Sequence, residues 1–422
     1  MNVNKITLMS VIMLLAFNIF CFATDARIYG LGVEPWMVND DDMLMSLYPS
    51  QVINNQNEIE FGAIGRTAYV DYTIDSYMLS AGIDNYTGET AMTKPQSPYI
   101  YGYTADSGNV ENDNVWEYLI PTKSFYLTIA RQLNDGADVA LKFCGARAED
   151  NGNNIQEGNP GSFYYSNGSR LSQDYNLALG LTIKDLLDIS VTVGLPYVKN
   201  SGFINYTSDT LVTTPYMDEL LKYDYGVYGK VNARVILSWL TIGASYTAIS
   251  EKVSDVQRED LDNDGVYDMN DRFDSTFRDY EMAGGAAANL KLNDFISVIA
   301  GISVNYVFVD NLNDYNYLTI LLDSTEVATD MFTVPVYFAV EDRINENITW
   351  RAGLKQVVFA NDFGCSVDYL INPTNYIYFT NPVLLNTTFA SGLSYNIGNI
   401  TLDGVITLGY GLTSEISGKL KF

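Results

Sequence analysis

The segment from Asp260 to Asp271 has the most specific arrangement of chemically active residues in this sequence. It reads DLDNDGVYDMND, so carboxylates occupy positions 1, 3, 5, 9 and 12 of the segment and Gly265 occupies position 6. Ca²⁺ prefers about six to eight oxygen ligands, and the glycine permits the sharp turn with which one short loop surrounds the ion. The expected ligands are the side chains of Asp260, Asp262 and Asp264, the carbonyl oxygen of Val266, Asp268 through a water molecule, and Asp271, which closes the site. The spacing therefore predicts a structural Ca²⁺ site.

This segment differs from a regulatory EF-hand in two respects. Its last residue, Asp271, is aspartate rather than glutamate and has a shorter reach, and no amphipathic helical pattern flanks the segment. The segment therefore resembles the calcium loops of thrombospondin type-3 and dockerin modules. The alternative interpretation is an acidic loop that is simply solvated.

The composition argues against catalysis and against nucleic-acid binding. The chain of 422 residues has no histidine, which removes the Ser-His and Asp-His arrangements of hydrolases and acyltransferases. It has 51 acidic and 24 basic residues and a formal net charge of −27, whereas binding to phosphate groups needs clustered Lys and Arg. We therefore expect a protein that is not an enzyme, has no catalytic residues and binds no nucleic acid.

The first 23 residues have the pattern of a signal peptide. Lys5 precedes an almost continuously apolar run from Ile6 to Phe20, and small residues follow around Ala23. The run is shorter than the roughly 20 apolar residues that a membrane-spanning helix needs. Acylation of Cys21 is disfavoured because bulky Phe20 precedes it. We expect residues 1–23 to direct export.

Beyond the signal peptide, apolar and polar residues alternate with a period of two. At the C-terminus, Ile416, Leu420 and Phe422 fall on one face of a strand and charged residues on the other. Similar runs cover Tyr175–Ile183 and Leu187–Leu195. Counting the runs gives about 16 strands, or 14, each near the ~10 residues of a tilted spanning strand. The predicted fold is all-β, a transmembrane antiparallel β-barrel of about 14–16 strands.

The connections between the predicted strands alternate between short and long. Short ones fall at Asp75-Ser76, Asn134–Gly136, Asp185-Leu186, Ser238–Leu240, Asn293-Asp294, Asp342–Asn347 and Asn396–Asn399. Long ones, rich in Asn, Asp, Gly, Ser and Tyr, fall at Tyr86–Lys123, Arg147–Ser172, Pro196–Lys222, Glu251–Ser275, Asp310–Asp330 and Asp362–Thr374. Short periplasmic turns and long outer loops are typical of a barrel in the outer membrane of a bacterial cell. This asymmetry places the predicted calcium loop, residues 260–271, outside the cell.

Aromatic and charged residues follow the same pattern. Five aromatic residues lie beside short turns or the chain end, where an inner aromatic girdle is expected: Trp239, Phe295, Trp350, Tyr395 and Phe422. Six charged residues on the polar faces of strands are candidates to line the lumen: Lys142, Lys184, Asp188, Arg234, Arg351 and Lys355. Because charges inside a barrel need partners, a purely structural role is the favoured interpretation for each of them.

The residues before the first predicted strand resemble the start of a known family. Arg27–Gly32 is rich in glycine, and Asp40–Val52 has acidic residues followed by Tyr48-Pro49-Ser50-Gln51-Val52. This order is similar to that of FadL-like barrels, including the PorV-like branch, in which an Asn-Pro-Ala-Gly-Leu motif follows acidic residues, although only Pro49 matches the motif. The resemblance implies a lumen plug near Trp36 to Gln51. An ordinary N-terminal tail packed in the barrel mouth is the alternative.

The expected domains are the signal peptide (1–23), an N-terminal hatch or plug segment (24–56) and the transmembrane barrel (57–422). The first functional hypothesis is an outer-membrane channel or transporter, with passive or FadL-like passage of small or hydrophobic solutes. The second is a surface binding or assembly scaffold, or a PorV-like secretion partner, with a calcium-stabilised outer loop. The expected partners are outer-membrane lipid, an unknown small solute and, for the second hypothesis, surface proteins.

Overall fold

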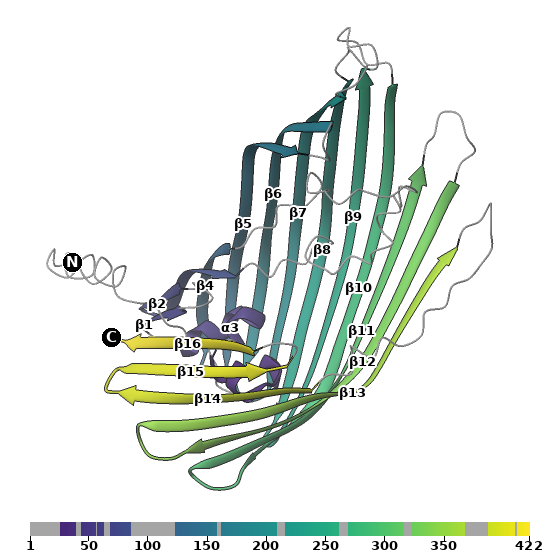
Figure 1. The fold of residues 1–422 in the computed structure, drawn as a ribbon. Helices are drawn as coiled ribbons and strands as arrows, with labels where there is room; N and C mark the ends of the chain where they lie inside the picture. The colour runs from purple at the N-terminus through teal and green to yellow at the C-terminus, as the bar shows by residue number, and fades with distance from the viewer. Residues whose placement is uncertain are drawn as a thin grey trace, which may run out of the picture.

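The structure, a computed structural model, contains a closed antiparallel β-barrel (Figure 1). It describes residues 26–38, 44–55, 57–62, 68–85, 123–157, 162–208, 216–260, 269–315, 323–367, 387–409 and 412–422. Within these ranges there are sixteen strands, which confirms the predicted fold class. They are β1 (Glu58–Gly62), β2 (Ala68–Ile74), β3 (Tyr77–Asn85), β4 (Lys123–Asn134), β5 (Ala137–Glu157), β6 (Ser162–Ile183), β7 (Leu187–Ser208), β8 (Tyr216–Leu237), β9 (Leu240–Asp260), β10 (Met269–Lys291), β11 (Ile296–Tyr315), β12 (Asp323–Arg343), β13 (Ile348–Val367), β14 (Thr387–Ile397), β15 (Ile400–Leu408) and β16 (Leu412–Lys421).

Pairing of the first and last strands closes the barrel. β1 and β16 are antiparallel, with Glu58 opposite Lys421 and Gly62 opposite Ser417. The backbone N–H of Phe422 donates to the carbonyl oxygen of Asn57 at 2.9 Å, so the terminal aromatic residue lies at the short-turn end of the barrel. The seven predicted short connections all fall between consecutive strands of the structure. Asp75, Asp185 and Ser238 adopt positive φ values of 54°, 59° and 54° in three of these tight turns.

The prediction of ~10-residue strands joined by long loops is wrong for the centre of the chain. Strands β5 to β13 have 20 to 23 residues each. Much of the predicted loop Arg147–Ser172 is paired strand, because Arg147 to Glu157 are in register with Gln173 to Phe163. Backbone groups make the ladder, so a sequence rich in Asn, Gly and Ser can still be a strand when its neighbours are strands. The same correction applies to parts of Pro196–Lys222, Glu251–Ser275, Asp310–Asp330 and Asp362–Thr374.

The wall is therefore much taller on one side than on the other (Figure 1). Strands β14 to β16 and β1 to β4 have only 5 to 12 residues. In the tall wall, the ladder between β11 and β12 is interrupted where Pro335 lies, because proline has no N–H to donate. The pairing of β12 with β13 also shifts register between Val334 and Pro335. The long strands of the tall wall bend as they rise from the short-turn end.

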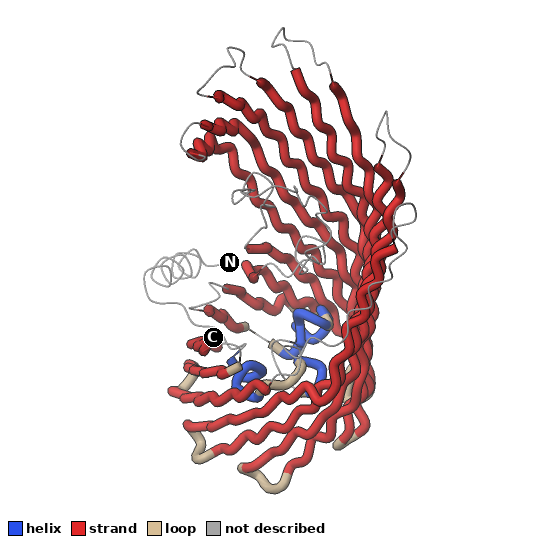
Figure 2. Tube along the Cα trace, turned by 45° about the vertical axis from the view of Figure 1, so that its right-hand side comes forward, coloured by secondary structure: helices blue, strands red, loops and turns tan. Residues whose placement is uncertain are grey.

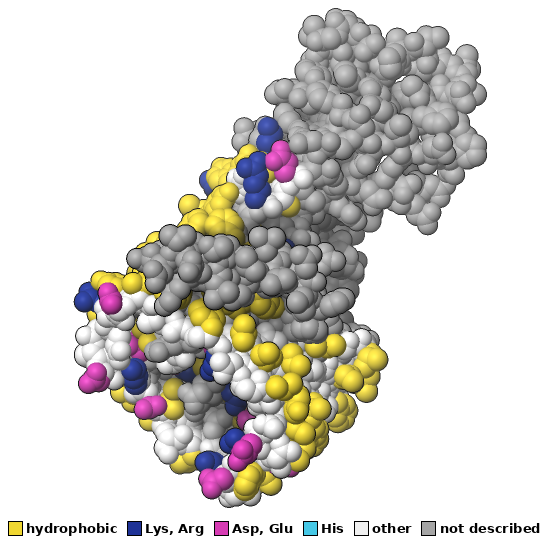
Figure 3. All heavy atoms as spheres, turned by 90° about the vertical axis from the view of Figure 1, so that its left-hand side faces the viewer, with side chains coloured by type: hydrophobic (Ala, Val, Ile, Leu, Met, Phe, Trp, Pro, Cys, Tyr) yellow, Lys and Arg dark blue, Asp and Glu magenta, His cyan; other side chains and the backbone are white. Residues whose placement is uncertain are grey.

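The outer surface of the barrel near the short-turn end is apolar and carries many aromatic side chains. We call this part of the wall the lower barrel. The burial of β14 alternates along the strand, with Phe389, Leu393 and Tyr395 exposed on the outside. The five aromatic residues predicted for the inner girdle are all at least 40% exposed beside the short turns or the chain end. Further from the short turns, aromatic residues form three groups on neighbouring strands, with ring centroids 5.7 to 6.4 Å apart within each group: Phe125, Phe143 and Tyr175; Tyr280 and Phe308; and Phe332 and Phe359. We call these three groups together the outer aromatic ring. Hydrophobic side chains cover much of the outer face, whereas charged ones lie around the hollow end (Figure 3).

The spacing of the two aromatic rings matches a bilayer. On β13, Trp350 and Phe359 are nine residues apart (359 − 350). At ~3.3 Å per residue and a tilt of ~40°, this separation is roughly 23 Å along the barrel axis, close to the ~25 Å apolar band of transmembrane barrels. The described residues include no helix long and apolar enough to cross a membrane.

Charge placed on the outer face tests the membrane assignment. Leu179 lies on β6, 60% exposed, midway between the two aromatic rings, and Leu186 lies in the β6–β7 turn, 47% exposed. We expect Leu179→Arg to lower the free energy of unfolding by about 2–4 kcal/mol in a bilayer, and Leu186→Arg by about 0–1 kcal/mol. Urea unfolding followed by tryptophan fluorescence measures both. Equal costs for the two variants would contradict a bilayer around this face.

Candidate functional site: the N-terminal segment inside the barrel

The described part of the N-terminal segment lies inside the barrel and touches opposite sides of the wall (Figure 2). Its elements are α2 (Ala26–Leu31), η1 (Pro35–Met37), α3 (Leu44–Leu47) and η2 (Pro49–Asn54). α2 contacts β12 to β16, η1 contacts β9 and β10, and η2 contacts β3 to β6. The segment Tyr48–Val52, which the resemblance placed at a family motif, forms the start of η2 and the residue before it.

Glycines in the wall make room for this segment. A Cβ atom at Gly180 of β6 would lie 2.8 Å from the backbone nitrogen of Ser50, and one at Gly243 of β9 would lie 2.5 Å from the Trp36 ring. A Cβ atom at Gly353 of β13 would overlap the carbonyl oxygen of Leu31. Such distances do not occur in packed proteins, so these positions accept only glycine while the segment is in place.

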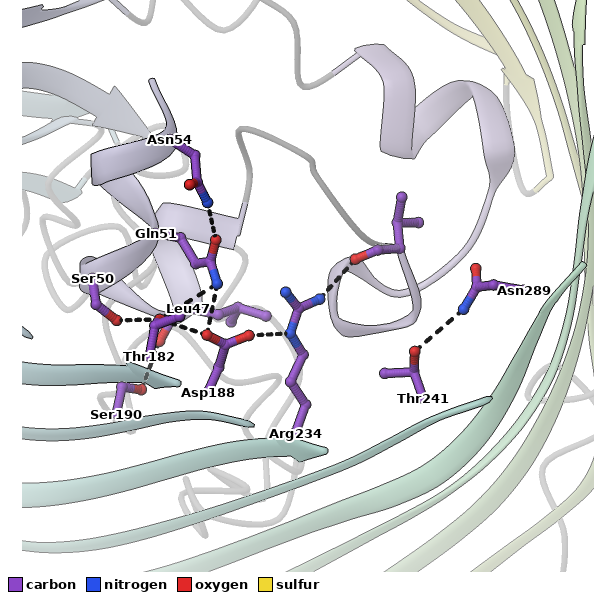
Figure 4. A network of polar contacts seen from close by, with 11 residues as sticks. Leu47, Ser50, Gln51, Asn54, Thr182, Asp188, Ser190, Arg234, Thr241 and Asn289 are labelled. Carbon is purple, nitrogen blue, oxygen red and sulfur yellow. Dashed lines mark hydrogen bonds and ion pairs between the residues drawn. The ribbon is translucent and has the colours of Figure 1, made fainter. Parts of the chain in front are cut away.

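A buried ion pair between Asp188 and Arg234 is the centre of the polar network on one side of the lumen (Figure 4). Arg234 Nε donates to Asp188 Oδ2 at 2.6 Å, and the two side chains are 2% and 1% exposed. Arg234 Nη1 donates to the carbonyl oxygen of Val38 at 2.7 Å, and its guanidinium lies 5.3 Å from the centre of the Tyr48 ring. Arg234 therefore binds both halves of the segment and the wall at once.

Uncharged donors attach η2 to the same strands. Gln51 Nε2 donates to Asp188 Oδ1 at 2.6 Å, and Ser50 Oγ lies 2.8 Å from Thr182 Oγ1. Ser190 Oγ donates to the carbonyl oxygen of Leu47 at 2.6 Å. Burial raises the pKa of the Tyr48 phenol well above its usual value, with Arg234 opposing this rise and Asp188 adding to it. The phenol is therefore neutral at physiological pH.

On the opposite side, charged residues attach α2. Arg27 binds Glu341 through two nitrogens, at 3.0 and 3.2 Å. Arg351 Nε also donates to Glu341, at 2.7 Å, and its Nη1 donates to Asp403 at 2.9 Å. Bidentate, charge-assisted contacts of this kind are stronger than neutral hydrogen bonds and fix the geometry of both partners.

A third group of contacts surrounds Glu34, between α2 and η1. The Tyr337 hydroxyl donates to Glu34 Oε1 at 2.8 Å, and Lys355 Nζ lies 3.4 Å from the same oxygen. Asn289 Nδ2 donates to the carbonyl oxygen of Met37 at 3.0 Å. The wall thus binds the segment through several strands.

The structure gives partners to most of the charged residues that the alternation placed on polar faces. Asp188, Arg234, Arg351 and Lys355 all form ion pairs inside the barrel, as the structural interpretation of these charges predicted. Lys142 Nζ lies 4.7 Å from the centre of the Tyr126 ring. Lys184 is different, because it is exposed in the β6–β7 turn.

The attachments at Arg27, Glu34 and Gln51 were missed at the sequence level, as were their wall partners Glu341 and Asp403. In the sequence these residues are recognisable only as polar residues, either at inward strand positions or in the segment that precedes the barrel.

Most of the predicted calcium ligands lie outside the residues that the structure describes. Asp260 is the last residue of β9, and Asp271 is the third residue of β10, opposite Gln257. Asp262, Asp264, Val266 and Asp268 lie outside the described residues. Among the residues that are described, no three His, Cys, Asp or Glu side chains gather in a way that could hold a metal ion. The calcium site remains a prediction.

Neither protein-family models nor curated proteins match this sequence. Among solved structures, similar ones include the toluene transporter TbuX of Ralstonia pickettii, with 13% identity, coverage of 96% of this chain and 100% of that one, and a TM-score of 0.37. A FadL homologue of Pseudomonas aeruginosa has 12% identity, coverage of 95% and 100%, and a TM-score of 0.43. The translocator domain of the autotransporter NalP of Neisseria meningitidis has 9% identity, coverage of 68% and 89%, and a TM-score of 0.30. All three similarities are weak.

A methyl group at Gly180 tests whether η2 is seated against the wall. In Gly180→Ala, the new Cβ meets Ser50 N and Pro49, so we expect η2 to be displaced at a cost of about 1–3 kcal/mol. Hydrogen exchange of residues 44–55 should become faster. Gly229→Ala on β8 is the matched control, because a Cβ there meets nothing within 4 Å. Unchanged exchange in Gly180→Ala would show that η2 does not rest on β6.

Proposed function

We propose that this protein is a passive transporter in the outer membrane of a bacterial cell, through which small or hydrophobic solutes pass, and that it is not an enzyme. The single observation that carries the proposal is the lumen, which holds near its short-turn end a segment that the wall binds mainly through side-chain contacts. An empty barrel of about sixteen strands is wide enough for solutes. The N-terminal segment would therefore decide whether solutes pass.

Ion pairs within the wall support the proposal that the N-terminal segment can leave its site in the lumen. Asp188 is paired with Arg234, and Glu341 and Asp403 are both paired with Arg351, and all five of these residues belong to the wall. Loss of one partner from a buried ion pair is strongly destabilising, because it leaves an uncompensated charge. When the segment leaves, each of these wall charges keeps its partner.

The surfaces support a membrane location and a lipid partner. The outer face of the lower barrel is apolar between two aromatic rings, which suits lipid, whereas the inner face carries the ion pairs. Antiparallel barrels with this arrangement are found in bacterial outer membranes.

Cross-linking the segment to the wall tests the transport proposal. In a background with Cys144→Ser and Cys365→Ser, the pair Ser50→Cys and Thr182→Cys replaces two oxygens that lie 2.8 Å apart. We expect oxidation to abolish uptake of a labelled apolar solute into proteoliposomes, and a reductant to restore it. The single variant Ser50→Cys is the control. Equal uptake in the oxidised and reduced states would contradict a role of the segment in transport.

The tall wall supports a second candidate function, a surface scaffold for other proteins. Strand β6 starts at Ser162, thirteen residues before Tyr175 of the outer aromatic ring (175 − 162), so β5 to β13 continue well beyond the apolar band. A solute path needs no wall of this height. The partners would be surface or secreted proteins, and capture of such proteins from intact cells, without any solute uptake by the purified barrel, would favour this function.

Calcium binding at the Asp260–Asp271 segment is compatible with both candidate functions. The spacing of its carboxylates and Gly265 supports the site, and we expect Ca²⁺ at millimolar concentration to protect residues 251–275 from proteases. The measurement is limited proteolysis with Ca²⁺ or with a chelator. Asp264→Asn with Asp268→Asn should remove the protection, and protection by Ca²⁺ that persists in this variant, or that never occurs, would argue against the site.

A further inference from the structure

The N-terminal segment packs against the barrel as two separate units. Residues 26–38 contribute Ile28, Leu31, Val33, Met37 and Val38 to one buried cluster, which also contains Ala287, Ile299, Tyr337 and Ala339 of the wall. Val52 belongs to a second and smaller cluster with Met78, Ala130 and Ala140, against which Met45 and Ile53 pack. The two clusters share no residue.

The two units differ in charge. Residues 44–55 read LMSLYPSQVINN and contain no Asp, Glu, Lys or Arg, so no ion pair can join this unit to the wall. Residues 26–38 contain Arg27 and Glu34, which pair with Glu341 and Lys355. The first unit is therefore attached by charged contacts and a larger apolar cluster, and the second by neutral donors and a smaller cluster.

Removal of each unit has a different consequence for the groups left behind. If residues 44–55 leave, Asp188 loses the neutral Gln51 but keeps Arg234 at 2.6 Å, and Thr182 keeps its hydrogen bond to Asp188 at 2.5 Å. If residues 26–38 leave, Lys355 loses Glu34 and Arg27 loses Glu341, so two ion pairs break. Five buried apolar side chains of the first unit must also separate from the wall.

Arg234 contacts both units of the segment. Its Nη1 binds the carbonyl oxygen of Val38 at the end of the first unit, and its guanidinium lies over the ring of Tyr48 in the second. Departure of the second unit costs Arg234 only the aromatic contact, because its bonds to Asp188 and Val38 remain. Arg234 would therefore still bind the first unit if the second moved.

We propose that the segment opens in two steps, in which residues 44–55 leave the wall of β3 to β6 while residues 26–38 stay bound to β9, β10 and β12 to β16. This inference deepens the proposed transport function, on which it rests for its biological meaning. The path through the barrel then opens along the β3–β6 side only. The first unit acts as a fixed anchor that returns the second to its seat.

Single cysteines at two equally buried positions test this order directly. In the background with Cys144→Ser, Cys365→Ser and Cys21→Ser, Val52→Cys reports on the second unit and Met37→Cys on the first, because the two side chains are 1% and 0% exposed. We expect a membrane-impermeant thiol reagent, applied to the full barrel in proteoliposomes, to label the cysteine at position 52 at least about tenfold faster, since labelling follows the population of the locally open state. Circular dichroism confirms that both barrels are folded. Equal rates, or faster labelling at position 37, would overturn the proposal.

Variants of the attachments give an independent readout. Gln51→Leu should accelerate labelling at position 52 and leave position 37 unchanged, because it removes a contact of the second unit only. Arg27→Gln should accelerate labelling at position 37, because it removes an ion pair of the first unit. If each variant accelerated both positions equally, the segment would move as one body. Labelling rates need no transported solute, so a barrel that fails to transport but shows this order disproves transport and not the two-step opening.

Discussion

The structure depends on one constraint, which is that a backbone in hydrocarbon finds no hydrogen-bond partner outside its own sheet. The ladder between β1 and β16 satisfies this constraint by closing the sheet, from Glu58 opposite Lys421 to Gly62 opposite Ser417. Closure of sixteen strands creates a lumen too wide for the side chains of the wall to fill. The N-terminal segment, the wall glycines and the buried ion pairs are all consequences of that lumen.

The lumen also accommodates the charged side chains of strands whose other face is apolar. Alternation sends every second side chain inward, so Asp188, Arg234 and Arg351 lie inside a wall whose other face is apolar. These side chains are at most 10% exposed, and buried charges need partners. The wall pairs them with one another first, and the N-terminal segment adds further partners. The charges of Asp188, Arg234 and Arg351 therefore do not depend on the segment for a partner, whereas Lys355 is paired with Glu34 of the segment.

The period-two pattern of the sequence was sufficient to predict the barrel, its short turns and the position of Phe422, because all three follow from which side chains face lipid. It was insufficient for strand length, since β5 to β13 continue past the lipid, where alternation is no longer required and the main-chain ladder still extends the sheet. The site was only partly predictable. The pattern indicated lumen-facing charges such as Asp188, but not which residues contact them. Partners inside the barrel can be 314 residues apart in the sequence, as Arg27 and Glu341 show. A resemblance over the first residues suggested a plug, whereas its attachment depends on register.

The wall glycines show that the lumen was shaped for the segment and not only filled by it. A barrel without a plug gains nothing from Gly180, Gly243 and Gly353 at inward positions, because glycine weakens a strand. These three positions lie on β6, β9 and β13, opposite Ser50, Trp36 and Leu31, and so receive both units of the segment. The complete ion pairs of the wall, in contrast, fit a barrel that is stable when part of the segment is absent. The glycines and these ion pairs of the wall are therefore both consistent with the proposed opening, in which the uncharged residues 44–55 move at a lower electrostatic cost than residues 26–38.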